Sequence, residues 1–374
     1  METKAAVLED TVDTHEFVED EVTHIDAVDV PEPTGDEVRV DISAASLCHT
    51  DISIALGFIP ESYPMVMGHE GAGIVRDVGE DVTELEPGDH VVLGRIACGQ
   101  CDYCRMGRSN LCERRGPCRT NGTLKDGQIR FSRDGEAIHH CHAISSFAET
   151  TITTEDLAVK IRDDLPMEKA TLLGCGIFTG AGSVMNAADV ESNSSLVLFG
   201  VGGVGLTAVQ AAAARSAGDI IAVDLVDEKL AMAESMGATH TINSGKADVV
   251  ERVMEITGNG ADYSFEFVGS PQVVEQLLPV LAPTGEAILV GSSPAGEHSI
   301  DLNLLDMMTS EKMLRGAFNG SYNLKLAIPA IADMIAEGVF DIDPLITDTR
   351  PVENLNEAME ALEDGSQIRQ VIQP

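Results

Sequence analysis

The chain of 374 residues contains no tryptophan, few other aromatic residues and few positive charges. Lysine and arginine number 24 against 62 aspartates and glutamates, which gives a formal net charge of −38 at pH 7. This charge repels nucleic-acid phosphates and anionic lipid surfaces, so we expect neither a nucleic acid nor a membrane as partner. The acids are dispersed and only 8 of the basic residues are lysines, a pattern that resembles adaptation to high salt. An ordinary acidic protein is the alternative.

Long apolar runs are also missing. No stretch approaches the roughly 18 residues that a membrane span requires. The N-terminal segment METKAAVLEDTVD carries acids where a secretion signal needs a basic and then an apolar run, so we expect a cytoplasmic protein. With 44% hydrophobic residues, the chain is too long for one compact core, and two domains are predicted.

The two parts of the chain differ in their patterns. Residues 1–175 combine short β-rich runs with glycine and proline turns, and predict a strand-rich domain. From about residue 177, apolar strands alternate with amphipathic helices, which predicts an α/β fold with a parallel sheet of six strands. The segment after residue 320 need not belong to that sheet and can return to the first domain. The expected elements include strands over 38–46, 72–79, 90–97, 286–291 and 312–318, and a helix over 271–282.

A glycine pattern indicates dinucleotide binding. The segment SLVLFGVGGVGL places Gly200, Gly202 and Gly205 directly after an apolar strand and before a helix. The first glycine permits a tight turn, the second lets the backbone approach a pyrophosphate, and the third allows close helix packing. Asp224 closes the next strand, where a carboxylate accepts the ribose hydroxyls and repels a 2′-phosphate, so NAD is favoured over NADP. A glycine-rich turn of an ordinary α/β domain is the alternative.

Four cysteines form a compact metal-binding pattern. Cys98, Cys101, Cys104 and Cys112 follow the spacing C-x2-C-x2-C-x7-C, which lets four thiolates reach one zinc ion from a single loop. Such a site leaves no position for a substrate, so its role is to fold the lobe of about residues 95–115. A pair of disulfides or an iron–sulfur cluster is the alternative.

Three further candidate ligands, Cys48, His69 and Cys175, lie apart in the sequence within SLCHTD, MGHEGAG and LLGCGIFTG. Taken singly, a buried cysteine is more often a small hydrophobic residue than a ligand. Five further cysteines and histidines lie in no such sequence motif, and we expect them to be structural or surface residues: Cys118, Cys141, His139, His140 and His142.

Together these motifs resemble the zinc-dependent alcohol dehydrogenases of the medium-chain dehydrogenase/reductase superfamily. The resemblance spans essentially the whole chain, and rests on the four-cysteine loop together with CHTD at 48–51, GHEGAG at 68–73, GCGIFTG at 174–180, GVGGVG at 200–205 and IR at 368–369. It implies a GroES-like catalytic domain from residues 1–176 and 321–374, a Rossmann domain from 177–320, and a dimer or tetramer. The stretch after Cys112 also resembles the longer branch that includes glutathione-dependent formaldehyde dehydrogenases.

The resemblance assigns a second, catalytic zinc ion to Cys48, His69 and Cys175, with one coordination position open. Three neighbouring residues receive roles from it: Thr50 accepts the alcohol proton, Asp51 hydrogen-bonds the ring of His69, and Glu70 approaches the zinc during ligand exchange. For the two acids, solvated surface positions are the alternative. Ser53 stands where relatives of the animal liver type carry the histidine that ends the proton relay.

The resemblance also extends the coenzyme site. His49 stands where many relatives carry an arginine that grips the pyrophosphate, and Phe147 is expected to line the substrate pocket. The spacing from Leu93, Gly94 and Arg95 to Cys98 is one residue shorter than in the animal enzymes, so pocket residues there are not carried over. The further residues assigned to the coenzyme are Thr179, Val201, Gly203, Val204, Lys229, Val290, Gly291 and Arg369.

The expected reaction is the reversible oxidation of a primary, or less commonly a secondary, alcohol by NAD through a zinc-bound alkoxide. One alternative is an enzyme acting on a thiol adduct of formaldehyde, favoured by the long insertion and by Arg114, Arg115 and Arg119, which can meet a carboxylate on the thiol carrier. A non-catalytic sensor of NAD and zinc is the alternative from a different class.

Overall fold

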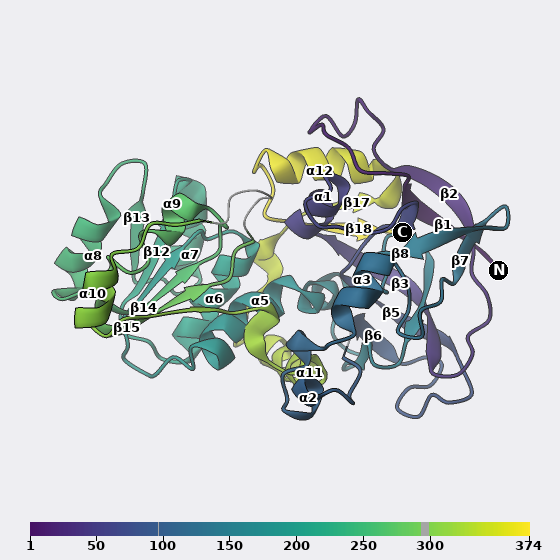
Figure 1. Cartoon of the computed structure of the whole chain (residues 1–374), viewed down its shortest axis with the longest axis horizontal. Coiled ribbons are helices and arrows are strands. Elements are labelled where there is room, and N and C mark those ends of the chain that lie inside the picture. Colours follow the sequence, from purple (N-terminus) through teal and green to yellow (C-terminus); the bar gives the residue numbers. More distant parts are fainter. Residues whose placement is uncertain (96, 293–298) are drawn as a thin grey trace. The chain divides into compact units, whose positions relative to one another are not determined.

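The chain folds into two compact units in the computed structural model, which describes residues 1–95, 97–292 and 299–374 (Figure 1). Unit 1 comprises Met1–Cys175 and Asn323–Pro374, and unit 2 comprises Gly176–Tyr322. Ile96, which belongs to the strand expected over 90–97, lies outside the described residues.

Unit 1 contains a closed barrel and a seven-stranded sheet. The barrel strands, in the order β1-β2-β7-β8-β4, are β1 (Glu2–Leu8), β2 (His24–Asp29), β7 (Phe131–Arg133), β8 (Glu136–His140) and β4 (Met65–Val66). The sheet strands are β10 (Ala158–Lys160), β6 (His90–Leu93), β5 (Gly71–Val78), β3 (Glu37–Leu47), β18 (Arg369–Gln373) and β17 (Ile346–Pro351), with β9 (Thr150–Thr154) paired to β3.

Short helices connect and cover these strands. The α-helices of unit 1 are α1 (His49–Ala55), α2 (Asp102–Arg105), α3 (Arg115–Asn121), α4 (Met167–Ala170), α11 (Leu324–Ala336) and α12 (Leu355–Glu363). Its one-turn 3-10 helices are η1 (Ser109–Leu111), η2 (Thr171–Gly174), η5 (Asp343–Leu345) and η6 (Val352–Asn354). The strand expected over 90–97 is shorter than predicted, because β6 ends at Leu93 and the N–H of Gly94 bonds to Leu157 instead.

The long strand β3 organises unit 1. It pairs antiparallel with β5, β9 and β18, and in the last pairing Leu47 lies opposite Gln370. Cys48 follows β3 directly, so its backbone is fixed by the neighbouring strands. The last strand of the chain therefore lies beside the start of the segment that carries a candidate zinc ligand.

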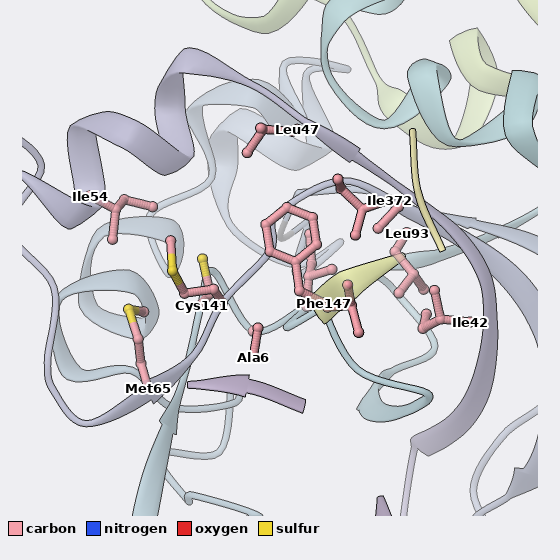
Figure 2. Close-up of a cluster of buried hydrophobic side chains, with 14 of the residues drawn as sticks. Ala6, Ile42, Leu47, Ile54, Met65, Leu93, Cys141, Phe147 and Ile372 are labelled. Carbon is pink, nitrogen blue, oxygen red and sulfur yellow. The ribbon is translucent and has the colours of Figure 1, made fainter. Parts of the chain in front are cut away.

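The core of unit 1 is built around Phe147, whose side chain is fully buried. Figure 2 shows it among Ala6, Leu47 and Ile372, which come from β1, β3 and β18. Burial of a phenylalanine contributes roughly 2–3 kcal/mol, so this ring helps to hold together strands from both ends of the chain. Phe147 belongs to this buried core, and its expected place in the substrate pocket stays a prediction.

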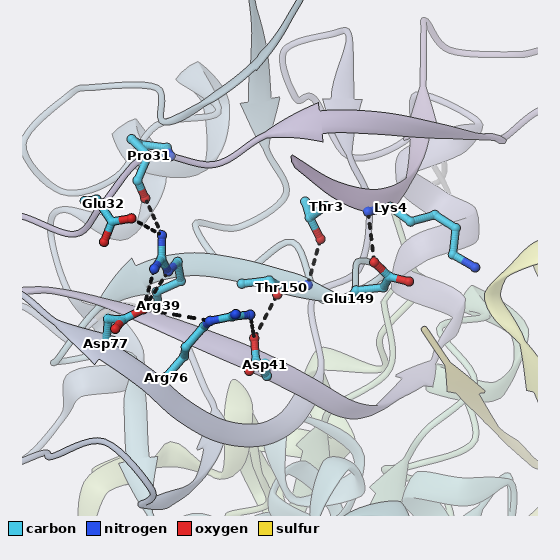
Figure 3. Close-up of polar contacts among 10 residues, drawn as sticks. All are labelled: Thr3, Lys4, Pro31, Glu32, Arg39, Asp41, Arg76, Asp77, Glu149 and Thr150. Carbon is cyan, nitrogen blue, oxygen red and sulfur yellow. Dashed lines mark hydrogen bonds and ion pairs between the residues drawn. The ribbon is translucent and has the colours of Figure 1, made fainter. Parts of the chain in front are cut away.

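Ion pairs on unit 1 reflect the shortage of basic residues. Arg39, only 5% exposed, donates from Nε to Asp77 over 2.9 Å and from Nη1 to Glu32 over 3.1 Å (Figure 3). Arg76 donates to Asp41 over 3.0 Å on the same sheet. In this acidic chain, one guanidinium group thus forms ion pairs with two carboxylates.

Unit 2 is a parallel six-stranded sheet with helices, as the alternating pattern predicted. In sheet order its strands are β13 (His240–Asn243), β12 (Ile220–Asp224), β11 (Leu196–Phe199), β14 (Ala261–Glu266), β15 (Leu281–Leu289) and β16 (Met313–Gly316). Its helices are α5 (Gly176–Gly182), α6 (Gly203–Ala214), α7 (Asp227–Ser235), α8 (Val249–Thr257), α9 (Pro271–Val274) and α10 (Leu304–Thr309), with the short η3 (Ser183–Ala187) and η4 (Asn319–Ser321).

One helix of unit 2 is much shorter than predicted. The sequence suggests a helix over 271–282, but α9 ends at Val274, turns follow, and β15 begins at Leu281. Several backbone hydrogen bonds here span three residues, such as Leu277 N–H to Val274, and Pro279 has no N–H to donate. Pairing of β15 with β14 outweighs the helical propensity of this segment.

Among the described residues, no single helix is long and apolar enough to cross a membrane. One bent pair of helices, Met167–Gly174 with Gly176–Ala187, meets the test of length and composition only when both are taken together.

Candidate zinc and coenzyme sites

The four cysteines of the predicted structural site converge in unit 1. The sulfur atoms of Cys98, Cys101, Cys104 and Cys112 all lie within 4.8 Å of one another. The Cys98 and Cys104 sulfurs are 4.0 Å apart, close to the separation of about 3.8 Å that a zinc–sulfur distance of about 2.3 Å gives in a tetrahedron. Backbone N–H groups of Cys98 and Cys101 each lie 3.4 Å from a sulfur of the cluster. All eight cysteines are free thiols, and these four fit one zinc ion.

A second cluster brings together residues that are far apart in the sequence. Cys48 precedes α1, His69 lies between β4 and β5, and Cys175 follows η2. Their ligand atoms, with a carboxylate oxygen of Glu70, all lie within 4.8 Å of one another. Nε2 of His69 is buried and has no hydrogen-bond partner, as expected of a nitrogen that a metal ion satisfies. Two sulfurs and one imidazole nitrogen fit a zinc ion with one position left for a substrate.

Asp51 holds this cluster in shape. Its Oδ1 lies 2.8 Å from Nδ1 of His69, and its Oδ2 accepts the backbone N–H of Cys48 over 3.1 Å. The Asp51 side chain is fully buried, and burial raises its pKa. With Nδ1 donating to the carboxylate, Nε2 carries the lone pair that faces the two sulfurs.

Glu70 and Arg369 form a buried ion pair at the same cluster. Their side chains are 0% and 5% exposed, and Nη1 of Arg369 lies 3.3 Å from Oε1 of Glu70. Burial raises the pKa of Glu70 to about 8, against the opposing effect of Arg369. Hydrogen bonding with Cys175 holds the pKa of Cys48 well below its ordinary value. Arg369 thus contacts the predicted zinc environment in addition to its assigned role toward the coenzyme.

Thr50 and His49 lie in the first turn of α1. The Thr50 hydroxyl is 3.9 Å from the Cys48 sulfur, so it lies beside the predicted metal position. His49 is exposed, and its contact with the coenzyme stays a prediction. Ser53 lies one turn further on and is half-buried.

In unit 2 the glycine pattern forms a strand–turn–helix junction between β11 and α6. Gly200 has a φ of +84°, a conformation that side chains disfavour. A Cβ on Gly205 would lie 2.0 Å from the carbonyl oxygen of Gly200, whereas one on Gly202 would meet nothing within 4 Å. The backbone is therefore tightly packed at Gly205, whereas the space beside Gly202 is open. Val201, Gly203 and Val204 complete this junction.

The remaining coenzyme candidates of unit 2 lie on neighbouring elements. Asp224 ends β12, and its Oδ2 accepts the N–H of Val201 over 2.9 Å, which ties it to the glycine turn. Lys229 is half-buried on α7, and the hydroxyl oxygen of Thr179 on α5 is buried without a hydrogen-bond partner. Val290 and Gly291 follow β15, and both donate backbone N–H groups to the carbonyl of Glu266 at the end of β14.

The similarity to known proteins covers both units. The description "Alcohol dehydrogenase GroES-like domain" matches residues 34–163, and "Zinc-binding dehydrogenase" matches residues 203–337. An S-(hydroxymethyl)glutathione dehydrogenase of Synechocystis sp. is 37% identical over 350 residues, which is 92% of this chain and 94% of that protein. The chain belongs to the zinc-dependent alcohol dehydrogenases.

Solved structures of the medium-chain dehydrogenase/reductase superfamily agree with this assignment. An alcohol dehydrogenase zinc-binding domain protein from Burkholderia ambifaria has a TM-score of 0.94 and 36% identity, and the match covers 100% of this chain and 99% of that one. A benzyl alcohol dehydrogenase from Acinetobacter calcoaceticus has a TM-score of 0.92, 34% identity and the same coverage. The predicted fold class and the prediction of a zinc-containing dehydrogenase are thereby confirmed.

Three residues of this dehydrogenase escaped the assignment from sequence. Arg95, Glu61 and His142 gather beside the second cluster, and the sequence pattern left His142 as a structural or surface residue. They come from three separate segments and follow no ligand spacing. The only available hint is an acid within the apolar run GFIPESYPM, which by itself does not reveal its partners.

Proposed function

We propose that this dehydrogenase oxidises a primary alcohol to its aldehyde with NAD, and runs in reverse with NADH. The observation that carries the proposal is the cluster of Cys48, His69 and Cys175 with an unpartnered, buried Nε2, beside the hydroxyl of Thr50. In the balanced reaction the alcohol loses a hydride from carbon to C4 of the nicotinamide and a proton from oxygen, and yields aldehyde, NADH and a proton.

Each residue of the cluster has a distinct part in this reaction. A zinc ion bound there supplies a Lewis acid that lowers the pKa of an alcohol hydroxyl. Thr50 Oγ1 accepts the hydroxyl proton and has its own proton to pass on. Asp51 fixes the ring of His69, so the cluster keeps its geometry while the proton leaves.

NAD is the coenzyme we propose, on the evidence of Asp224. Its carboxylate also accepts the backbone N–H groups of Leu225 and Val226, which keep it at the end of β12 near the glycine turn. A negative charge fixed there favours ribose hydroxyls and opposes the 2′-phosphate of NADP.

A second candidate function is the oxidation of a thiol adduct of formaldehyde. It is favoured by the name of the Synechocystis relative, and by Arg115 and Arg119, which face one cavity beside the zinc-binding cluster. Arg114 is exposed and does not line that cavity, so two of the three arginines noted in the sequence fit this alternative.

The test is NADH formation by the zinc-loaded, full-length protein. It is assayed with a panel of primary and secondary alcohols and with formaldehyde plus glutathione, each at low and molar salt. Cys48→Ala is expected to abolish turnover while the protein keeps the zinc of the four-cysteine loop. Cys118→Ala removes a buried thiol outside both clusters and serves as the matched control.

Turnover of simple alcohols that is lost only in Cys48→Ala supports the alcohol dehydrogenase proposal. Turnover that requires formaldehyde and thiol together selects the second candidate. Absence of turnover by a protein that binds two zinc ions and NAD contradicts both, and leaves a sensor role.

A further inference from the structure

Positive charge is concentrated in one short part of the chain. Residues 95–119 contain six arginines, two acids and no lysine, which gives this segment a formal charge of +4 in a chain of −38. The segment holds the four cysteines of the predicted structural zinc site, and it includes η1 and the helix α2 that Figure 1 labels. Its charge is therefore opposite to that of the chain as a whole.

Three of these arginines are exposed and have no ion-pair partner among the described residues. They are Arg105 at the end of α2, Arg108 before η1, and Arg114 before α3. Arginines that are exposed elsewhere, such as Arg76 and Arg252, pair with carboxylates of the same chain. In a chain with 62 acids, these three guanidinium groups thus keep their charge available to a partner.

Apolar side chains lie between these arginines. Tyr103, Met106 and Leu111 are 41%, 65% and 37% exposed. Local hydrogen bonds fix the backbone here, since the N–H of Arg108 bonds to the carbonyl of Tyr103 and the N–H of Leu111 to that of Arg108, each over 2.9 Å. Tyrosine, methionine and arginine are enriched in protein–protein interfaces. We call the six residues together the basic face: Tyr103, Arg105, Met106, Arg108, Leu111 and Arg114.

Unit 1 also carries a surface of the opposite charge. Residues 13–21, here called the acidic turn, contain five acids and no lysine or arginine. These acids are exposed, and none of them forms an ion pair within the part of the chain that the structure describes. Phe17 is fully buried and Val22 is 6% exposed, so the turn is anchored in the core. Val18, 40% exposed, offers an apolar contact among the acids.

Helix α12 holds the acidic turn in place. Oε1 of Glu360 accepts the backbone N–H of Val18 over 2.8 Å, and Oε1 of Glu363 lies 3.0 Å from Nδ1 of His15. The turn therefore lies against α12 (Figure 1), which adds two further carboxylates beside it. A surface that is fixed before binding loses little conformational freedom when a partner binds.

We propose that the basic face binds the acidic turn of a second copy of this chain. The unpaired guanidinium groups of one surface match the unpaired carboxylates of the other, and both surfaces add exposed apolar side chains. Because each copy carries both surfaces, two copies can make the contact twice about a two-fold axis. The inference goes beyond the proposed function and does not depend on it, since no residue of either surface is a candidate zinc ligand or coenzyme residue.

The net charge of the chain sets the conditions for this association. Two copies that each carry −38 repel one another at long range. At 0.15 M salt the Debye length is about 8 Å, so this repulsion is largely screened, whereas charge pairs in direct contact are screened much less. The contact should therefore be measured near this ionic strength.

Reversal of single charges tests the contact. Sedimentation equilibrium of the zinc-loaded full chain in 0.15 M salt gives the dissociation constant between copies. Arg108→Glu and Glu19→Arg should each raise this constant by about tenfold or more, because like charges then face each other. Glu19→Arg also makes the chain less negative, so a weaker association cannot result from greater overall repulsion. Arg252→Glu, at an exposed position on α8, changes the net charge as Arg108→Glu does and should have no effect.

A mixture of the two variants identifies the partner surface. In a mixed pair, the intact basic face of Glu19→Arg meets the intact acidic turn of Arg108→Glu. At the second contact, the introduced arginine meets the introduced glutamate. Opposite charges face each other at both contacts, so the mixture should associate more tightly than either variant alone. Both variants should retain two zinc ions and the wild-type melting temperature, because both positions are exposed.

The outcomes decide between this contact and other arrangements. Weaker association of each variant with recovery in the mixture supports the inference, whether or not any alcohol is oxidised. Three results overturn it: a wild-type chain that stays monomeric at all concentrations, weaker association without recovery in the mixture, and an effect of Arg252→Glu equal to that of Arg108→Glu. None of these three results bears on the dehydrogenase activity, which is assayed separately.

Discussion

Replacement of Asp51 by asparagine tests how the second cluster is held. The carboxylate accepts two hydrogen bonds, from Nδ1 of His69 at 2.8 Å and from the N–H of Cys48 at 3.1 Å. Asparagine has one acceptor oxygen, so its amide NH2 must face one of these two donors. Either Nδ1 of His69 loses its acceptor and Nε2 takes the hydrogen, or the backbone at Cys48 shifts.

Both results weaken the cluster without removing a ligand. Loss of an outer partner of a zinc-binding histidine reduces metal affinity or activity by about 10- to 100-fold. The matching free energy is about 1.4–2.8 kcal/mol. We therefore expect Asp51→Asn to keep its fold and the zinc of the four-cysteine loop, and to release the second zinc faster.

The assay follows zinc transfer to a chromogenic chelator and counts the zinc that remains by atomic emission. Asp29→Asn, at an exposed position on β2, is the matched control. The reasoning is refuted if the folded Asp51→Asn protein releases its second zinc at the wild-type rate. Equal loss of both zinc ions would also contradict it, because that result indicates a general loss of structure.

Three further predictions concern other parts of the chain. Burial lowers the pKa of His140 from 6.5 to about 3, so the unfolded chain binds the proton first as pH falls. This group should therefore lower the free energy of unfolding by up to about 4–5 kcal/mol between pH 6.5 and pH 3. Urea unfolding at a series of pH values should show that the free energy of unfolding of His140→Gln changes less steeply with pH. Cys112→Ser should cost one zinc per chain and lower the melting temperature while Nε2 of His69 keeps its metal, as metal analysis with calorimetry can check; retention of two zinc ions would contradict the assigned site. Asp224→Ala should reduce the NAD over NADP preference in kcat/KM by about 10- to 100-fold, and an unchanged ratio would exclude Asp224 as its source.

The parallel sheet was predictable because its pattern is local. Strands such as β11 and β12 are apolar runs bounded by turns, and the glycines at 200–205 mark the junction of β11 and α6. The helix expected over 271–282 is wrong at its end, where pairing with β14, a contact distant in sequence, fixes Leu281 in β15. Local propensity contains no information about such a partner.

The candidate site also has parts that a local sequence pattern predicts and parts that it does not. The spacing of four cysteines predicts a metal site by itself, whereas Cys48, His69 and Cys175 were assigned to one site only through the family resemblance. Glu61 and His142 belong to no motif, and their proximity depends on loops whose packing a single sequence does not specify. Only the folded chain therefore shows that these two residues lie beside the arginines that the sequence had singled out.

The position of β18 has a consequence for how the enzyme is made. Residues 369–373 are synthesised after the whole of unit 2, yet they supply a strand beside β3 and the guanidinium that contacts Glu70. Unit 2 is continuous in the chain and unit 1 is not, so unit 2 can fold during translation before the second segment of unit 1, Asn323–Pro374, has been made. A product that terminates before Arg369 lacks both contributions. We therefore expect such products to form the fold of unit 2 without a complete zinc environment in unit 1.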